Sequence, residues 1–156
     1  MEEIIDRLIE EIKNLMSMTH ADGGLSDTLE VKTVYFGDPG VIPQSLMPCI
    51  MVEPIAESPN GETTSYDKRF LEVNILVMID AREYFEVDAE EAMGDRKLVQ
   101  SAALVSRFFR TKEKRQLGGL VNDIMVNDTT YDIQDRGNAI VKTARVNLQI
   151  MKAFTR

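Results

Sequence analysis

The fold is decided by the stretch FLEVNILVMI, residues 70–79. Every second residue in it is aliphatic and most of these are β-branched, as in a strand with one buried face. The alternate positions begin polar, with Glu72 and Asn74. They then become apolar, with Leu76 and Met78. We therefore expect a strand whose first half has one wet side and whose second half is covered on both sides.

A second long strand, predicted over residues 139–154, repeats this pattern. Two long strands that each have one apolar and one polar face are typical of the middle of an antiparallel sheet with helices on one side only. The polar face must then look toward water, a neighbouring subunit or a lumen. Its candidate residues are Glu72, Asn74, Arg145, Asn147 and Gln149.

Two helices are predicted to cover the apolar side of the sheet. Residues 2–18 carry an apolar stripe at three- and four-residue spacing, and their first turn is acidic. The second helix runs from Asp88 to Arg110, and a capping box of Asp88 and Glu91 opens it.

Four shorter strands complete the sheet, at residues 28–36, 49–55, 120–126 and 130–133. Prolines at both ends of the second of these favour an edge position, and turn residues at 58–61 predict a hairpin into the first long strand. Asn127 and Asp128 predict a hairpin between the last two short strands. The order is then α-β-β-β-α-β-β-β. This predicts one α+β domain over residues 1–156, with a mixed or antiparallel sheet and two main helices packed on one face.

Length and composition agree with one globular domain. The chain has 156 residues, of which 44% are hydrophobic and 28% charged. Its net charge of −8 argues against a broad nucleic-acid-binding surface, because phosphate contact needs clustered lysine and arginine. No apolar run approaches the ~20 residues that span a bilayer, and the N-terminus is acidic. We expect a protein made in a cytoplasm.

The sequence offers little catalytic chemistry. Cys49 is the only cysteine, and its apolar neighbours favour a core residue over a nucleophile. His20 and Asp22 are two candidate metal ligands on a loop, which are too few for a site. The glycines form neither a phosphate loop nor a dinucleotide fingerprint. We therefore expect no enzyme activity, cofactor or metal.

The connection between residues 36 and 48 is unusual for a monomeric domain. It carries Val41, Ile42, Leu46 and Met47. Apolar residues in such a connection are either tucked under their own fold or inserted into a neighbouring molecule. Both alternatives stay open, and the four residues are candidate interface positions.

The loop after the second helix holds the only concentrated positive charge, at Lys112, Lys114 and Arg115. It is either a solvated loop favoured by the helix dipole or a contact for an acidic partner surface or phosphate.

The strand-and-connection stretch resembles a known family. Residues 34–39 (VYFGDP), 42–43 (IP) and 46–54 (LMPCIMVEP) are similar to the "FGDP…IP…LPxIxVEP" stretch of small structural proteins in tailed phages. Together with the long strands at 69–81 and 138–156, they make the chain resemble the tail terminator, or tail completion, proteins of long-tailed bacteriophages.

The resemblance implies an α+β subunit of a homohexameric ring in the neck of the virion. Such a ring caps the tail tube protein, stops its polymerisation and joins the tail to the head–tail connector protein. DNA passes through the lumen without sequence-specific binding, and the family implies no cofactor, catalytic residue or membrane contact. The alternatives are a head–tail connector or stopper protein of the same phage module, or a small cytoplasmic α+β ligand-binding protein or enzyme. The last would need a pocket with convergent polar groups.

Overall fold

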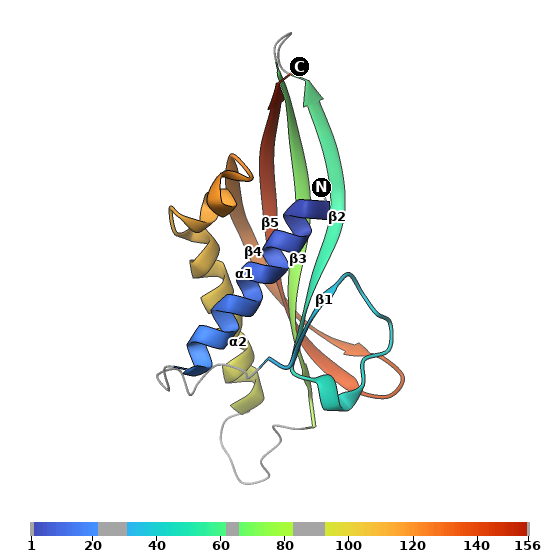
Figure 1. The fold of residues 1–156 in the computed structure, drawn as a ribbon. Coiled ribbons are helices and arrows are strands. Elements are labelled where there is room, and N and C mark those ends of the chain that lie inside the picture. Colours follow the sequence, from blue (N-terminus) through green and yellow to red (C-terminus); the bar gives the residue numbers. More distant parts are fainter. Residues whose placement is uncertain (1, 22–30, 62–65, 83–92, 156) are drawn as a thin grey trace.

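The computed structural model describes residues 2–21, 31–61, 66–82 and 93–155. A five-stranded sheet carries two long helices, which confirms the α+β class (Figure 1). With η for a 3-10 helix, the elements are α1 (Glu2–Ala21), β1 (Thr33–Phe36), η1 (Gln44–Leu46), β2 (Cys49–Gly61), β3 (Tyr66–Asp80), α2 (Met93–Arg110), η2 (Lys114–Gly119), β4 (Asp123–Asp135) and β5 (Ile140–Thr155).

The strands lie in the order β1-β2-β3-β5-β4. Only β1 and β2 are parallel, so the sheet is mixed, which is one of the two predicted alternatives. The strand that contains residues 70–79 is the middle one. It pairs with β5 along its whole length, from Tyr66 opposite Thr155 to Asp80 opposite Val141. The prediction of two long central strands is confirmed.

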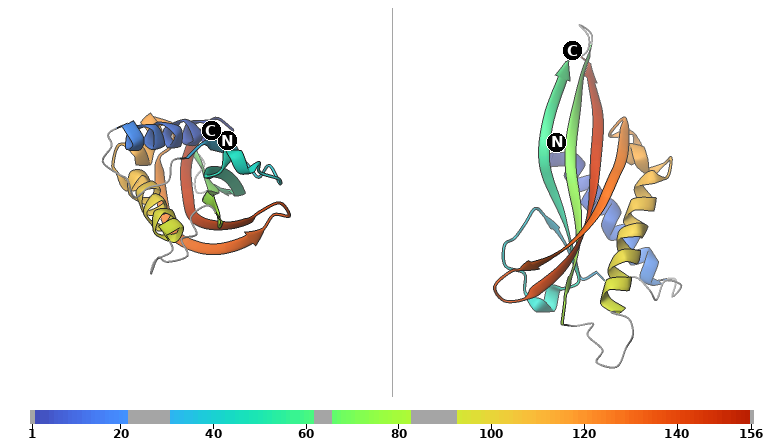
Figure 2. Two further views of the ribbon diagram at one scale, coloured as in Figure 1. Left: turned by 90° about the horizontal axis from the view of Figure 1, so that it is seen from below. Right: turned by 180° about the vertical axis from the view of Figure 1, so that it is seen from behind.

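The main core lies between the sheet and the two helices, which are on the same side of it (Figure 2). Leu8 and Ile12 of α1 and Val105 and Phe109 of α2 are fully buried there. Burying one such side chain contributes roughly 1.5–3 kcal/mol. The strands supply the opposing residues Ile50, Val52, Leu71, Val73, Ile75, Val77, Ile79, Ala144, Val146, Leu148 and Ile150.

A second, smaller core covers part of the opposite face. Leu76 and Met78 of β3 are buried there together with Ile42 and Met47 from the connection between β1 and β2. Earlier in β3, Glu72 is exposed on this face. The predicted change from one-sided to two-sided burial along β3 is therefore confirmed.

The predicted hairpin at Asn127 and Asp128 is wrong. β4 is one strand that pairs with β5 on both sides of these residues, and its register shifts between Val126 and Thr129. One extra residue in one strand of an antiparallel pair is accommodated by a bulge. The described order is thus α-β-β-β-α-β-β, one strand fewer than predicted.

The predicted turn at residues 58–61 is also wrong, because these residues pair with 67–70 as the end of β2. The hairpin between β2 and β3 is confirmed, but its turn lies outside the described residues. β1 pairs only with residues 49–52. After them, in the described part of the chain, the outer edge of β2 has no partner. Pro54 and Pro59 lie in this free part of β2, where a missing N–H costs little. The predicted edge position of the strand 49–55 is therefore wrong for residues 49–52, which β1 covers, and holds only after them.

Several boundaries differ from those expected. β1 begins at Thr33, so residues 31–32 of the predicted strand 28–36 are not in it, and residues 28–30 lie outside the described part. α1 continues through His20 to Ala21. The expected capping box at Asp88 and Glu91 lies outside the described residues. None of the described helices is long and apolar enough to cross a membrane.

Candidate functional site

A strip of hydrogen-bonded polar side chains crosses the face of the sheet that the helices leave uncovered. Asn147 of β5 donates from Nδ2 to Glu72 Oε1 and Asn74 Oδ1 of β3, each at 2.9 Å. Asn127, in the β4 bulge, donates from Nδ2 to Asn147 Oδ1 at 2.7 Å. These four residues, called the polar strip below, hold one another's orientation across three strands. Asn127 was missed because its sequence context is that of a turn.

The two other predicted face residues flank the polar strip. Arg145 and Gln149 are both half-buried. Arg145 Nη2 lies 3.9 Å from Asp132 Oδ2 of β4, at the outer limit of an ion pair. Toward the end of the sheet the face becomes apolar, where Phe70 pairs with Met151. The uncovered face therefore combines a polar middle with an apolar end.

The connection between β1 and β2 contains both buried and exposed apolar side chains. Ile42 and Met47 are fully buried in the chain's own second core, so their prediction as interface residues is wrong. They cover apolar residues of β2 and β3 that would otherwise face water. Val41 and Leu46 are 66% and 37% exposed and remain candidates for contact with another molecule.

Arg136, in the turn between β4 and β5, holds this connection. Its Nη1 donates to Asp38 Oδ1 at 2.8 Å and to Gly40 O at 3.0 Å. Its Nη2 donates to Asp38 Oδ2 at 3.2 Å. The hydrogen bond from Arg136 keeps the pKa of Asp38 below its usual value. The loop that presents Val41 is thus tied to the sheet.

The basic loop after α2 is largely engaged within the chain. Lys114 Nζ lies 2.8 Å from Glu11 Oε2 of α1, whose carboxylate is buried. Arg115 donates two hydrogen bonds, of 2.8 and 2.7 Å, to the carboxylate of Asp123 in β4. Lys112 is exposed and pairs with no acidic side chain that the structure describes. Of the three predicted contacts for an acidic partner, Lys112 is the one that is available.

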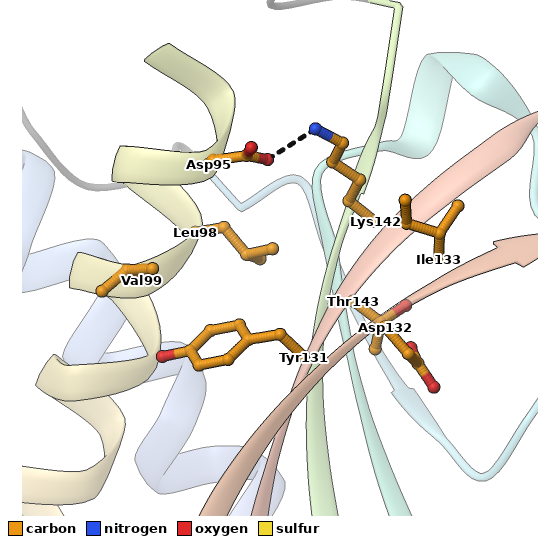
Figure 3. A pocket seen from close by; sticks show the side chains of 8 residues that line it. All are labelled: Asp95, Leu98, Val99, Tyr131, Asp132, Ile133, Lys142 and Thr143. Atoms are coloured by element: carbon orange, nitrogen blue, oxygen red, sulfur yellow. Dashed lines mark hydrogen bonds and ion pairs between the residues drawn. The ribbon is translucent and has the colours of Figure 1, made fainter. Parts of the chain in front are cut away.

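A groove of about 380 Å³, called the α2–β4 groove below, lies between the first half of α2 and the strands β4 and β5 (Figure 3). An ion pair of 2.7 Å between Lys142 Nζ and Asp95 Oδ1 crosses one end of it. The groove is lined mainly by apolar side chains. Leu98 is buried, Val99 and Tyr131 are about half exposed, and Ile133 is about two-thirds exposed. Asp95 and Lys142 pair with each other, and the ion-pair partner of Asp132 is Arg145, outside the groove.

A second hollow, of about 400 Å³, lies at the opposite edge of the sheet. It is bounded by the start of α1, with Glu2 and Ile5, and by the free part of β2. Phe36 and Ile55, also in its lining, are 52% and 47% exposed. Neither hollow could be predicted, because the sequence does not show how far along each strand the helices extend.

The described residues are poor in reactive chemistry. Cys49 is buried, and burial raises its pKa to about 12, so its thiol is protonated at neutral pH. In the described ranges no group of three or more His, Cys, Asp or Glu side chains could hold a metal. The His20 side chain and Asp22, the predicted weak ligands, lie outside the described part.

A scan against protein-family models finds no match, and neither does a search of curated proteins. The function is therefore inferred from the chain's own residues and their geometry.

Proposed function

We propose that the chain is the subunit of a ring that terminates a phage tail tube and joins it to the head connector. The observation that carries this proposal is the polar strip on a sheet whose other face is covered by helices. A subunit that lines a lumen needs one ordered polar face toward the lumen and a covered face toward the outside. The polar strip meets the first need, and α1 and α2 meet the second.

The charge of this face supports a channel that conducts DNA without retaining it. The polar strip contains one carboxylate and three amides, and the whole chain has a net charge of −8. DNA phosphates are held by clustered lysine and arginine, and a negative surface repels them. A lumen formed by Glu72 and its asparagine neighbours would let a duplex slide.

The shape of the sheet supports a contact with stacked partners. The ends of β2, β3 and β5 extend beyond both helices (Figure 1). Phe70 of β3 and Met151 of β5 pair in register on the uncovered face, and both are half-buried. We assign this extension to contact with the tail tube protein or the connector protein.

The first test is the mass of the purified chain in solution at several concentrations, with negative-stain images of the same sample. We expect rings of roughly six subunits that bind the ends of tail tubes. Rings that bind a connector but ignore tube ends would favour a connector or stopper protein of the same module. A chain that stays monomeric at every concentration and leaves tube growth unchanged would contradict the proposal.

A charge reversal tests which face lines the lumen. Glu72→Lys places a cation on the polar strip, so rings of this variant should retain duplex DNA at low salt. Glu10→Lys makes the same charge change on the exposed side of α1 and is the matched control. Equal DNA binding by the two variants would mean that the polar strip does not face the lumen.

The α2–β4 groove favours a second candidate, a small-molecule-binding protein. Its volume of about 380 Å³ lies within the range of ligand pockets, although few polar groups point into it. A compound that raises the melting temperature of the wild-type chain but not of Tyr131→Ala would support this function. Rings that show no such ligand would favour the first candidate.

A further inference from the structure

We propose that neighbouring copies in the ring contact each other through opposite edges of the sheet, with the start of α1 in one copy against the end of α2 in the next. This inference rests on the proposed ring function and assigns the surfaces that build the ring. The contact is head-to-tail, so each copy uses two different patches, and repetition of such a contact can close a ring.

The first patch, called the acidic patch, comprises Glu2, Glu3 and Asp6. All three side chains are exposed at the start of α1, and none pairs with a basic side chain that the structure describes. Glu2 also lines the hollow beside the free part of β2. The patch therefore presents negative charge at the β2 edge of the sheet that no described basic side chain pairs with.

The second patch, called the basic patch, comprises Arg107, Arg110 and Lys112. All three are exposed at or just after the end of α2, and they too form no ion pair within the described ranges. The neighbouring residue Arg115 binds Asp123 of β4, which ties this end of α2 to the outer strand of the sheet. The basic patch thus lies at the β4 edge.

The two patches lie on opposite sides of one molecule. α1 begins beside β2, whereas α2 ends on the side of β4, at the other edge of the sheet (Figure 1). A two-fold contact would bring like charges together at either patch. A head-to-tail contact brings the acidic patch of one copy to the basic patch of the next, and unlike charges then set partner choice and orientation.

Exposed apolar side chains at each edge supply surface for the contact to bury. Phe36 and Ile55 lie beside the acidic patch, and Tyr131 and Ile133 lie on the same β4 edge as the basic patch but further along it, beside the first half of α2. Exposed ion pairs alone stabilise little, so burial of these residues must supply most of the affinity. Pro54 makes main-chain pairing along the β2 edge unfavourable, and the contact is therefore made by side chains.

Two charge-swapped variants test this pairing. The first, Arg107→Glu with Arg110→Glu, makes both patches acidic, and the second, Glu3→Lys with Asp6→Lys, makes both basic. Each alone should lose its rings, while circular dichroism and the melting temperature show that it still folds. An equimolar mixture should regain rings of wild-type mass, because alternating copies then present unlike charges at every junction. Lys13→Glu, an exposed reversal outside both patches, should leave the rings intact.

The outcomes distinguish failure of the assigned contact from failure of the ring function. If wild-type rings form and neither swap changes their mass, the assigned contact is overturned and the ring function stands. If both swaps abolish rings and the mixture does not restore them, the patches do not pair with each other and the contact is overturned. If the wild-type chain forms no ring at any concentration and leaves tube growth unchanged, both proposals fail together.

Discussion

Replacing Val146 by aspartate should destabilise the chain severely. Val146 is fully buried on the helix side of β5, opposite Ile75 of β3 and Thr129 of β4. The change forfeits about 1.5–3 kcal/mol of apolar burial. An unpaired carboxylate in this core would take up a proton instead of remaining charged, which costs about 1.4 kcal/mol for each pH unit above its ordinary pKa near 4. At pH 7 the two effects sum to about 6 kcal/mol, against a total stability of ~5–15 kcal/mol for a domain.

The assay is urea unfolding followed by circular dichroism, since the chain has no tryptophan to report by fluorescence. Thr130→Asp, exposed on the opposite face across from Arg145, is the control and should cost less than about 1 kcal/mol. The new carboxylate in the Val146 variant has a raised folded pKa, so its penalty is present at pH 7 and shrinks as the pH falls. At pH 5.5 the penalty should be smaller by about 2 kcal/mol. If the variant unfolds at the wild-type urea concentration at both pH values, Val146 does not face the main core.

Three further outcomes are expected from contacts in the sheet and its loops. The hydrogen bond from Arg136 lowers the pKa of Asp38 in the folded chain. The Asp38 carboxylate therefore stabilises the fold fully above its unfolded pKa near 4, and this stabilisation is lost as the pH falls below that value. Asp38→Asn should thus flatten the fall of the melting temperature below pH 4. Cys49 should resist thiol reagents at pH 8 and react at a rate set by unfolding, and rapid labelling of the native chain would contradict its burial. Lys114→Glu should lower the free energy of unfolding in urea by about 2 kcal/mol, because it places a carboxylate beside the buried carboxylate of Glu11. The control Lys112→Glu should change the free energy of unfolding by less than about 0.5 kcal/mol. Equal losses in the two variants would contradict the pairing of Lys114 with Glu11.

The centre of the fold could be predicted from side-chain alternation alone. In β3 the shift from Glu72 and Asn74 to Leu76 and Met78 records, residue by residue, where the second core begins. Such a pattern is informative because a one-residue slip in register would move Leu71 and Val73 from the main core to the uncovered face.

The errors arose where turn-forming residues occur inside strands. Asn127 and Asp128 are typical of hairpin turns, but β5 is long enough to pair on both sides of them, and a bulge absorbs the extra residue. Ser58 and Pro59 lie at the end of β2, where no strand pairs with the outer edge of β2, so the N–H that proline lacks is not needed for a hydrogen bond. In both cases the partner strand overrides the local preference.

The candidate site was predicted in part. The polar residues of β3 and β5 are evident from alternation, because a polar side chain on a long central strand must face away from the core. Lys114 pairs with Glu11 of α1, and Arg115 pairs with Asp123 of β4. Nothing in the sequence indicates either ion pair, because the fold brings these residues together. The exposure of Tyr131 likewise depends on where α2 lies.

The pairing of β3 with β5 has a consequence for how the chain folds. β2–β3 and β4–β5 are each joined by a short connection, and a two-stranded hairpin by itself is marginally stable in water. The pairing of β3 with β5 joins the two hairpins and closes a long loop that contains α2 and η2. The entropy lost in closing this loop is incurred before the core contacts form and compensate for it. Folding should therefore be slow relative to helical proteins of this size.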